Sequence, residues 1–96
     1  MYLYNVSIIV ENDHHERLMD WLKNNWFITL PTSAKLLKML DSPHEGHTYS
    51  VQLLFEHASE IPVFQKEKVS KLQAYIAENH NEKAFLFEST MKYILR

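Results

Sequence analysis

Apolar or aromatic side chains occupy every even position from Tyr2 to Val10. The odd positions between them mix apolar and polar residues, so one face of the segment is more apolar than the other. A period of two is typical of a β-strand with one face against a core. Because a lone strand cannot bury such a face, this segment indicates a sheet.

A helical pattern follows the strand. Asp13 and Glu16 have the spacing of a capping box, and apolar residues then recur at helical intervals as far as Trp26. We therefore expect a helix over about residues 13–25, with Trp21 on its buried stripe and Trp26 partly exposed. Residues 27–33 contain a proline and fit neither period, so they are interpreted as a connector with at most one extra turn.

The middle of the chain is expected to form a β-hairpin. Residues 34–40 suit an edge strand or a short helix, and the context favours the strand. Residues 42–46 have turn chemistry and include Gly46, the one glycine of the chain. Alternation resumes after the glycine and continues to about Glu56, which predicts the second arm of the hairpin.

A second helix and a last strand complete the order. Ser59 can cap a helix in which Pro62 lies in the tolerated first turn, and apolar residues at helical spacing continue to Ile76. The helix is expected to end at about Asn79, and alternation begins again near Phe85. The predicted order is therefore βαββαβ.

This order predicts one α+β domain over residues 1–96 with the ferredoxin-like sandwich fold. With right-handed crossovers it gives a four-stranded antiparallel sheet of order 4-1-3-2, with two helices on one face. Other four-stranded antiparallel arrangements remain possible but need more crossing connections. With 96 residues, of which 46% are hydrophobic, the chain is long enough to bury a core.

Two faces of the sheet are expected to differ. The face under the helices is predicted to carry an apolar set: Tyr4, Val6, Ile8, Val51, Leu53, Phe55, Phe85 and Phe87. The opposite face is predicted to carry a mixed set: Leu3, Asn5, Ser7, Ile9, Ser50, Gln52, Leu54, Leu86 and Glu88. Solvent alone could cover the mixed face, but its apolar content favours a second copy of the chain packed sheet to sheet as a homodimer.

Three short stretches resemble a known family. They are Tyr4-Asn5-Val6-Ser7, the segment from Gly46 to Gln52, and Phe87-Glu88-Ser89-Thr90-Met91. Together they resemble the uncharacterised family called domain of unknown function 4286, over nearly the whole chain. Its members are similar to the dimeric α/β barrel group, which includes antibiotic-biosynthesis-type monooxygenases and stress-responsive barrel proteins. The resemblance implies a homodimer but no reaction, so the catalytic residues, if there are any, remain unknown.

Polar residues on the mixed face are candidates for a ligand pocket. Asn5, Ser7, Gln52 and Glu88 could orient a small hydrophobic or aromatic ligand through hydrogen bonds. If a partner subunit desolvated Glu88 or Glu56, the pKa of that carboxyl would rise and it could act as a general acid or base. The commoner outcome for such strand carboxylates is plain exposure to solvent.

Five of the six histidines fall at one end of the predicted sheet. They are His14, His15, His44, His47 and His80, whereas His57 lies at the far end. Neutral imidazoles bind zinc, nickel or copper, so these five are candidate metal ligands. The alternative is that they are ordinary loop residues, since no pair has the i, i+4 spacing of a known metal motif.

Composition argues against several other functions. A net charge of −2 predicts no nucleic-acid partner, and the absence of cysteine excludes thiolate chemistry. One glycine cannot build a phosphate-binding or dinucleotide-binding loop, and no cofactor is expected. Because no signal peptide and no apolar run of about 18 residues is present, we expect a cytoplasmic protein with no membrane contact.

Three functional hypotheses remain. The first is a non-catalytic homodimeric module that serves as a binding or scaffold unit. The second is a cofactor-independent, monooxygenase-like enzyme, or a carrier of a small hydrophobic or aromatic ligand. The third is a metal-responsive protein that uses the histidines at the sheet end.

Overall fold

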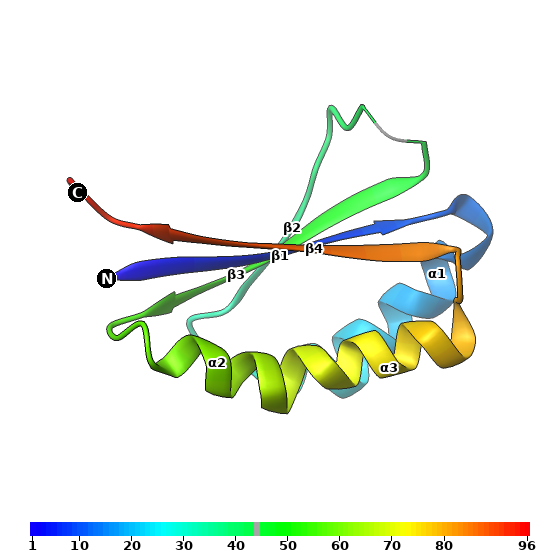
Figure 1. The fold of residues 1–96 in the computed structure, drawn as a ribbon. Coiled ribbons are helices and arrows are strands. Elements are labelled where there is room, and N and C mark those ends of the chain that lie inside the picture. The colour runs from blue at the N-terminus through cyan, green and yellow to red at the C-terminus, as the bar shows by residue number, and fades with distance from the viewer. Residues whose placement is uncertain (44) are drawn as a thin grey trace.

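Four antiparallel strands form one sheet, and helices pack against a single face of it (Figure 1). The computed structural model describes residues 1–43 and 45–96. The strands are β1 (Tyr2–Val10), β2 (Lys35–Lys38), β3 (His47–Phe55) and β4 (Ala84–Lys92). Their spatial order is β2-β3-β1-β4, which is the predicted order read from the other edge. The ferredoxin-like topology is therefore confirmed.

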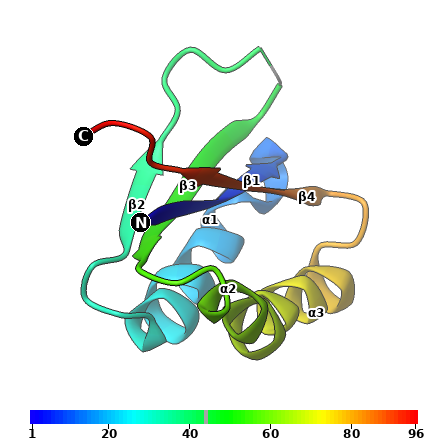
Figure 2. The same cartoon turned by 60° about the vertical axis from the view of Figure 1, so that its left-hand side comes forward.

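Two long helical segments form the second layer (Figure 2). The first runs through α1 (Asn12–Trp21), the π-helical turn η1 (Leu22–Trp26) and the 3₁₀ turn η2 (Phe27–Thr29). The second runs through α2 (Glu60–Phe64), the π-helical turn η3 (Gln65–Val69) and α3 (Ser70–Asn79). No helix within the described residues is long and apolar enough to cross a membrane.

The expected helix caps do not form. The N-cap of α1 is Glu11 and makes no side-chain cap bond, so Asp13 lies inside the helix. Ser59 holds the N-cap position of α2 but also makes no side-chain cap bond. Instead the backbone N–H of His57 donates to Glu60 Oε2 at 2.9 Å. A carboxylate in the first turn therefore supplies the local hydrogen bond there.

The core lies between the sheet and the helices. Tyr4, Val6, Ile8 and Val10 are all fully buried, as the alternation in β1 predicts. Trp26 is also buried, and its indole Nε1 donates to the Lys68 backbone oxygen at 2.8 Å, which joins the two helical segments.

The two tryptophans exchange the environments that the sequence suggested. Trp21 is half-buried and stacks on Tyr75, with ring centroids 3.8 Å apart. The π-helical turn η1 adds a residue to the helical repeat, which shifts the buried stripe and brings Trp26 into the core.

The prediction for β4 is wrong in one respect, because its two faces are interchanged. Phe85 and Phe87 are 51% and 58% exposed, so they do not belong to the core. Leu86 pairs with Ile8 and Glu88 pairs with Val6, so both lie on the helix-covered face. The face away from the helices is therefore more apolar than the sequence analysis expected.

The turn before β4 explains why the two faces of the strand are interchanged. The backbone N–H of Lys83 donates to His80 O at 2.8 Å, and the N–H of Glu11 donates to Lys83 O at 2.9 Å. These bonds place Ala84 opposite Val10, on the helix side. Ala84 is 5% exposed where α3 ends, a position with room for a small side chain.

Gly46 closes the hairpin against the end of β1. Its φ is +84°, a conformation that residues with a Cβ rarely adopt. A Cβ built on Gly46 would lie 2.3 Å from the backbone oxygen of Val10. The one glycine of the chain is therefore required by both the turn and the close contact.

Candidate functional site

The sheet face opposite the helices, called the open face here, carries its side chains in four rows across the strands. Register partners on adjacent strands point to the same side, so the pairing assigns every member. In order along β1, the rows are the tail-end row (Leu54, Leu3, Met91), the polar row (Lys35, Gln52, Asn5, Ser89), the mixed row (Leu37, Ser50, Ser7, Phe87) and the loop-end row (Thr48, Ile9, Phe85).

Charge is nearly absent from the open face. Lys35, on the edge strand β2, is the one charged residue in the four rows, although the chain has 10 basic and 12 acidic residues. Large apolar side chains in these rows are nevertheless half-exposed: Leu37, Leu54, Phe85, Phe87 and Met91. Exposed apolar side chains without neighbouring charges are typical of a surface that a partner covers.

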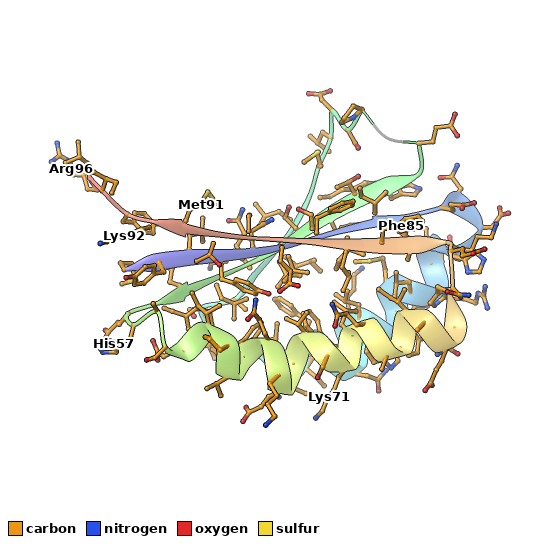
Figure 3. All side chains as sticks on the ribbon, viewed as in Figure 1. His57, Lys71, Phe85, Met91, Lys92 and Arg96 are labelled. Atoms are coloured by element: carbon orange, nitrogen blue, oxygen red, sulfur yellow. The ribbon has the colours of Figure 1, made fainter. Side chains whose placement is uncertain are left out.

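Two chain segments rise from the ends of the open face (Figure 1). The β2–β3 loop, described at residues 39–43 and 45–46, rises above the sheet in the half where β3 begins. The C-terminal tail, residues 93–96, rises beyond the other end, on the same side of the sheet. In Figure 3, Met91 and Arg96 lie on this side and Lys71 lies on the helical side. Both segments therefore project on the side of the open face.

An apolar groove lies beside the β2–β3 loop. It has a volume of about 380 Å³ and is lined by Ser7, Ile9, Met39, Pro43, Thr48 and Phe87. A second groove of about 290 Å³ lies nearby and is lined by Ile9, Glu11, Glu45, Lys83, Phe85 and Phe87. Phe87 and Ile9 line both grooves, so the two grooves lie side by side at the loop end of the open face, and together they are called the loop-end hollow.

Three of the four predicted pocket residues lie together on the open face. Asn5 Nδ2 donates to Ser7 Oγ at 2.9 Å, and Gln52 is the register partner of Asn5. Glu88 does not join them, because it lies on the helix-covered face. There Glu88 Oε1 accepts hydrogen bonds from the Tyr4 hydroxyl and from Gln65 Nε2. Burial is the main cause of a strongly raised pKa at Tyr4, which therefore stays protonated as the donor.

Four of the five candidate metal ligands form two pairs at one end of the molecule. His14 Nδ1 and His80 Nδ1 are 2.8 Å apart, on one side of α1. On the other side, the rings of His15 and His47 stack with centroids 3.7 Å apart. His44 lies outside the described residues. His57 lies at the opposite end of the molecule, as expected (Figure 3).

A hydrogen bond joins His14 and His80. The Arg17 guanidinium donates to His14 Nδ1 at 3.2 Å, so the proton of the His14–His80 hydrogen bond is assigned to His80 Nδ1. Burial lowers the pKa of His80, and the nearby His14 and Arg17 lower it further. Within the described residues no three histidine or carboxylate side chains converge as metal ligands. A guanidinium beside His14 also opposes a second cation there.

Burial also acts on the second histidine pair. His15 Nε2 lies 2.5 Å from the Tyr49 hydroxyl, within hydrogen-bond distance. The pKa of His15 is lowered by burial first, then by the neighbouring His47 and Lys38. Burial therefore favours the neutral imidazole of His15, as it does that of His80.

Comparison with known proteins identifies the family. A family model described as "domain of unknown function (DUF4286)" matches residues 1–94. The chain belongs to the DUF4286 family. No curated protein matches this DUF4286 member.

Solved structures include one with a related arrangement of elements. It is a crystal structure from Thermus thermophilus, described provisionally as a PII-like signaling protein, and it shares 12% identity with this DUF4286 chain. The alignment covers 95% of this chain and 87% of that chain, with a TM-score of 0.43. A similarity of this size says nothing about what the DUF4286 chain binds.

Sequence reasoning missed the hollow at the loop end. Met39 and Pro43 were assigned to an edge strand and a turn, and nothing in their spacing predicts that they face Phe87. The hollow depends on the face that β4 presents, because Phe87 pairs with Ser7 and lies beside it on the open face. The side-chain alternation of β4 does not by itself distinguish its two faces, because Phe85 and Phe87 fit a core or an exposed surface.

Proposed function

We propose that this chain is a non-catalytic binding or scaffold module that works as a homodimer, with the open faces of two copies packed together. Phe85 and Phe87 support this proposal most directly. Both are more than half exposed on a face whose strand rows hold a single charge. In an isolated chain both rings would be exposed to water. Association would bury them and gain the free energy of removing their apolar surface from water.

The size of the sheet suits a dimer interface. Three strands of nine residues and one of four, at about 4.8 Å between strands and about 3.3 Å per residue, give a flat area of roughly 490 Å². A standard interface buries about 800 Å² on each partner. The relief of the side chains, the β2–β3 loop and the tail add to the area that the open face can bury.

The composition of the open face also suits a dimer. Interface cores are depleted in charged residues and enriched in aromatic residues and methionine, which describes the rows holding Phe85, Phe87 and Met91. The polar row supplies side-chain amides and hydroxyls that can bond across the interface or to trapped water. Lys35 lies on edge strand β2, where a charge can remain in the solvated rim.

A pair of matched aspartate variants tests this proposal. Phe87→Asp places a carboxylate on the open face, and Val63→Asp does so on α2 at a similar exposure of 54%. Sedimentation velocity at about 1 to 100 µM should show F87D as a single subunit and V63D as a dimer like the unchanged protein. Circular dichroism checks that both variants fold. A folded F87D variant that remained dimeric would contradict the proposal.

A further inference from the structure

We propose that the C-terminal tail of each copy lies in the loop-end hollow of the other copy. This inference rests on the proposed homodimer, because it requires two open faces in contact. It assigns the hollow between Met39, Pro43 and Phe87 an occupant, residues 93–96 of the second copy. An exchanged segment would then contact the other copy at each end of the dimer.

The raised segments restrict how two open faces can meet. The β2–β3 loop and the tail project on the same side of the sheet from opposite ends (Figure 1). If two copies stacked with the same ends together, loop would meet loop and hold the sheets apart. With the copies reversed end for end, each loop lies beside the tail of the other copy. A two-fold axis that crosses the middle of the strands produces this arrangement.

The strand register shows where the tail would then lie. At one end of β1, Tyr93 N donates to Met1 O at 3.0 Å, and at the other end Glu11 N donates to Lys83 O at 2.9 Å. Val6 is halfway between Met1 and Glu11 along β1, so an axis near Val6 exchanges the two ends. The tail would therefore leave its own sheet directly above Glu11 and Lys83 of the other copy, which line the hollow.

Residues 93–96 cannot reach the hollow of their own chain. It leaves the sheet at the end opposite the hollow, and the nine-residue strand between them is about 30 Å long. Four extended residues reach only about 13 Å. Residues 93–96 can therefore fill the hollow of a second copy but not that of their own chain.

The chemistry of the tail matches that of the hollow. Ile94 and Leu95 are 81% and 84% exposed, and the groove beside the loop is lined mainly by apolar side chains. Arg96 follows them, and Glu45 lines the neighbouring part of the hollow, where Glu11 is paired with Lys83 at 3.8 Å. Burial of the two aliphatic side chains would supply most of the binding, with a smaller contribution from the exposed charges.

Cysteine cross-linking tests the contact directly, because the chain has no cysteine of its own. The variant that combines Leu95→Cys with Met39→Cys should form a disulfide-linked dimer under mild oxidation. A disulfide needs Cα atoms within about 7 Å, so it reports proximity. Leu95→Cys with Val63→Cys is the matched control, since Val63 lies on α2, and it should stay largely uncross-linked. Pairing Leu95→Cys with Glu45→Cys samples the other side of the hollow.

An affinity measurement supplies a second readout. Leu95→Asp should raise the dissociation constant of the dimer at least tenfold, whereas Ile28→Asp should leave it unchanged. Ile28 is 70% exposed on η2, on the helical side, so it carries a comparable substitution away from the interface. A dimer that forms neither disulfide and is not weakened by L95D would overturn the tail exchange and leave the proposed function standing. A protein that is monomeric without any substitution would overturn both.

Discussion

The hydroxyl of Tyr4, a fully buried residue of β1, donates a hydrogen bond to Glu88 Oε1 on the adjacent strand β4. Gln65 Nε2 donates to the same oxygen at 3.0 Å, so the contact joins β1, β4 and η3. Glu88 is thereby held on the helix side of the sheet. Because side chains alternate along a strand, Phe87 must face the other way. The pairing of Tyr4 with Glu88 is thus directly linked to the apolar character of the open face.

Removal of the Tyr4 hydroxyl should weaken the fold measurably. Tyr4→Phe keeps the ring but loses a hydrogen bond to a charged acceptor, which typically contributes about 1 to 3 kcal/mol. Urea denaturation at fixed protein concentration should show that loss, and Tyr2→Phe on the same strand should show less. A double-mutant cycle with Glu88→Ala, which removes the acceptor, isolates the pair. Strictly additive losses in that cycle would contradict the proposed coupling.

Stability should decrease as the pH falls below about 6.5. The pKa values of His80 and His15 are lowered in the folded protein, chiefly by burial, so the unfolded chain binds protons more readily. When the pH falls through the ordinary histidine pKa, these side chains become protonated in the unfolded chain but stay neutral in the folded protein. Proton binding then favours the unfolded chain. Urea midpoints at pH 7.5 and at pH 5.5 should therefore differ, with the lower midpoint at the acidic pH.

A variant of His80 tests the origin of this pH dependence. His80 is 1% exposed, and it faces His14, Arg17 and the Tyr75 ring. His80→Leu cannot be protonated, so it should flatten the change in midpoint between the two pH values, whatever its stability at pH 7.5. A full pH dependence in H80L would assign the effect to other groups.

Substitution of Gly46 should destabilise the hairpin. Gly46→Ala would combine a positive φ with a Cβ that lies 2.3 Å from Val10 O, so we expect a loss of at least about 2 kcal/mol. Thermal denaturation followed by circular dichroism measures the loss. Asp41→Ala, at an exposed position of the same loop, should change the midpoint little. Equal midpoints for the two variants would show that the turn can relax around a Cβ.

The topology could be predicted because its signals are local. Alternation in β1, the helical spacing after Glu60 and the turn chemistry near Gly46 each act over a few residues, and short right-handed connections then leave one arrangement. The end of the molecule that holds the histidines followed from the same topology. Their pairing did not, because the contact between His14 and His80 depends on side-chain packing between α1 and the end of α3.

The face of β4 could not be predicted from alternation. An interface and a core are both apolar, so Phe85 and Phe87 fit either side of a strand. The turn between His80 and Lys83 decides the phase through backbone hydrogen bonds that the side-chain pattern does not encode. The two phenylalanines turned away from the core are the observation on which the proposed homodimer mainly rests.

The mass of the unchanged protein in solution shows directly whether the homodimer forms. We expect sedimentation equilibrium to give twice the chain mass of 11.5 kDa, with dissociation only on strong dilution. A mass of 11.5 kDa at every concentration up to about 100 µM would contradict it, since association driven by an open face of this size should be complete at that concentration.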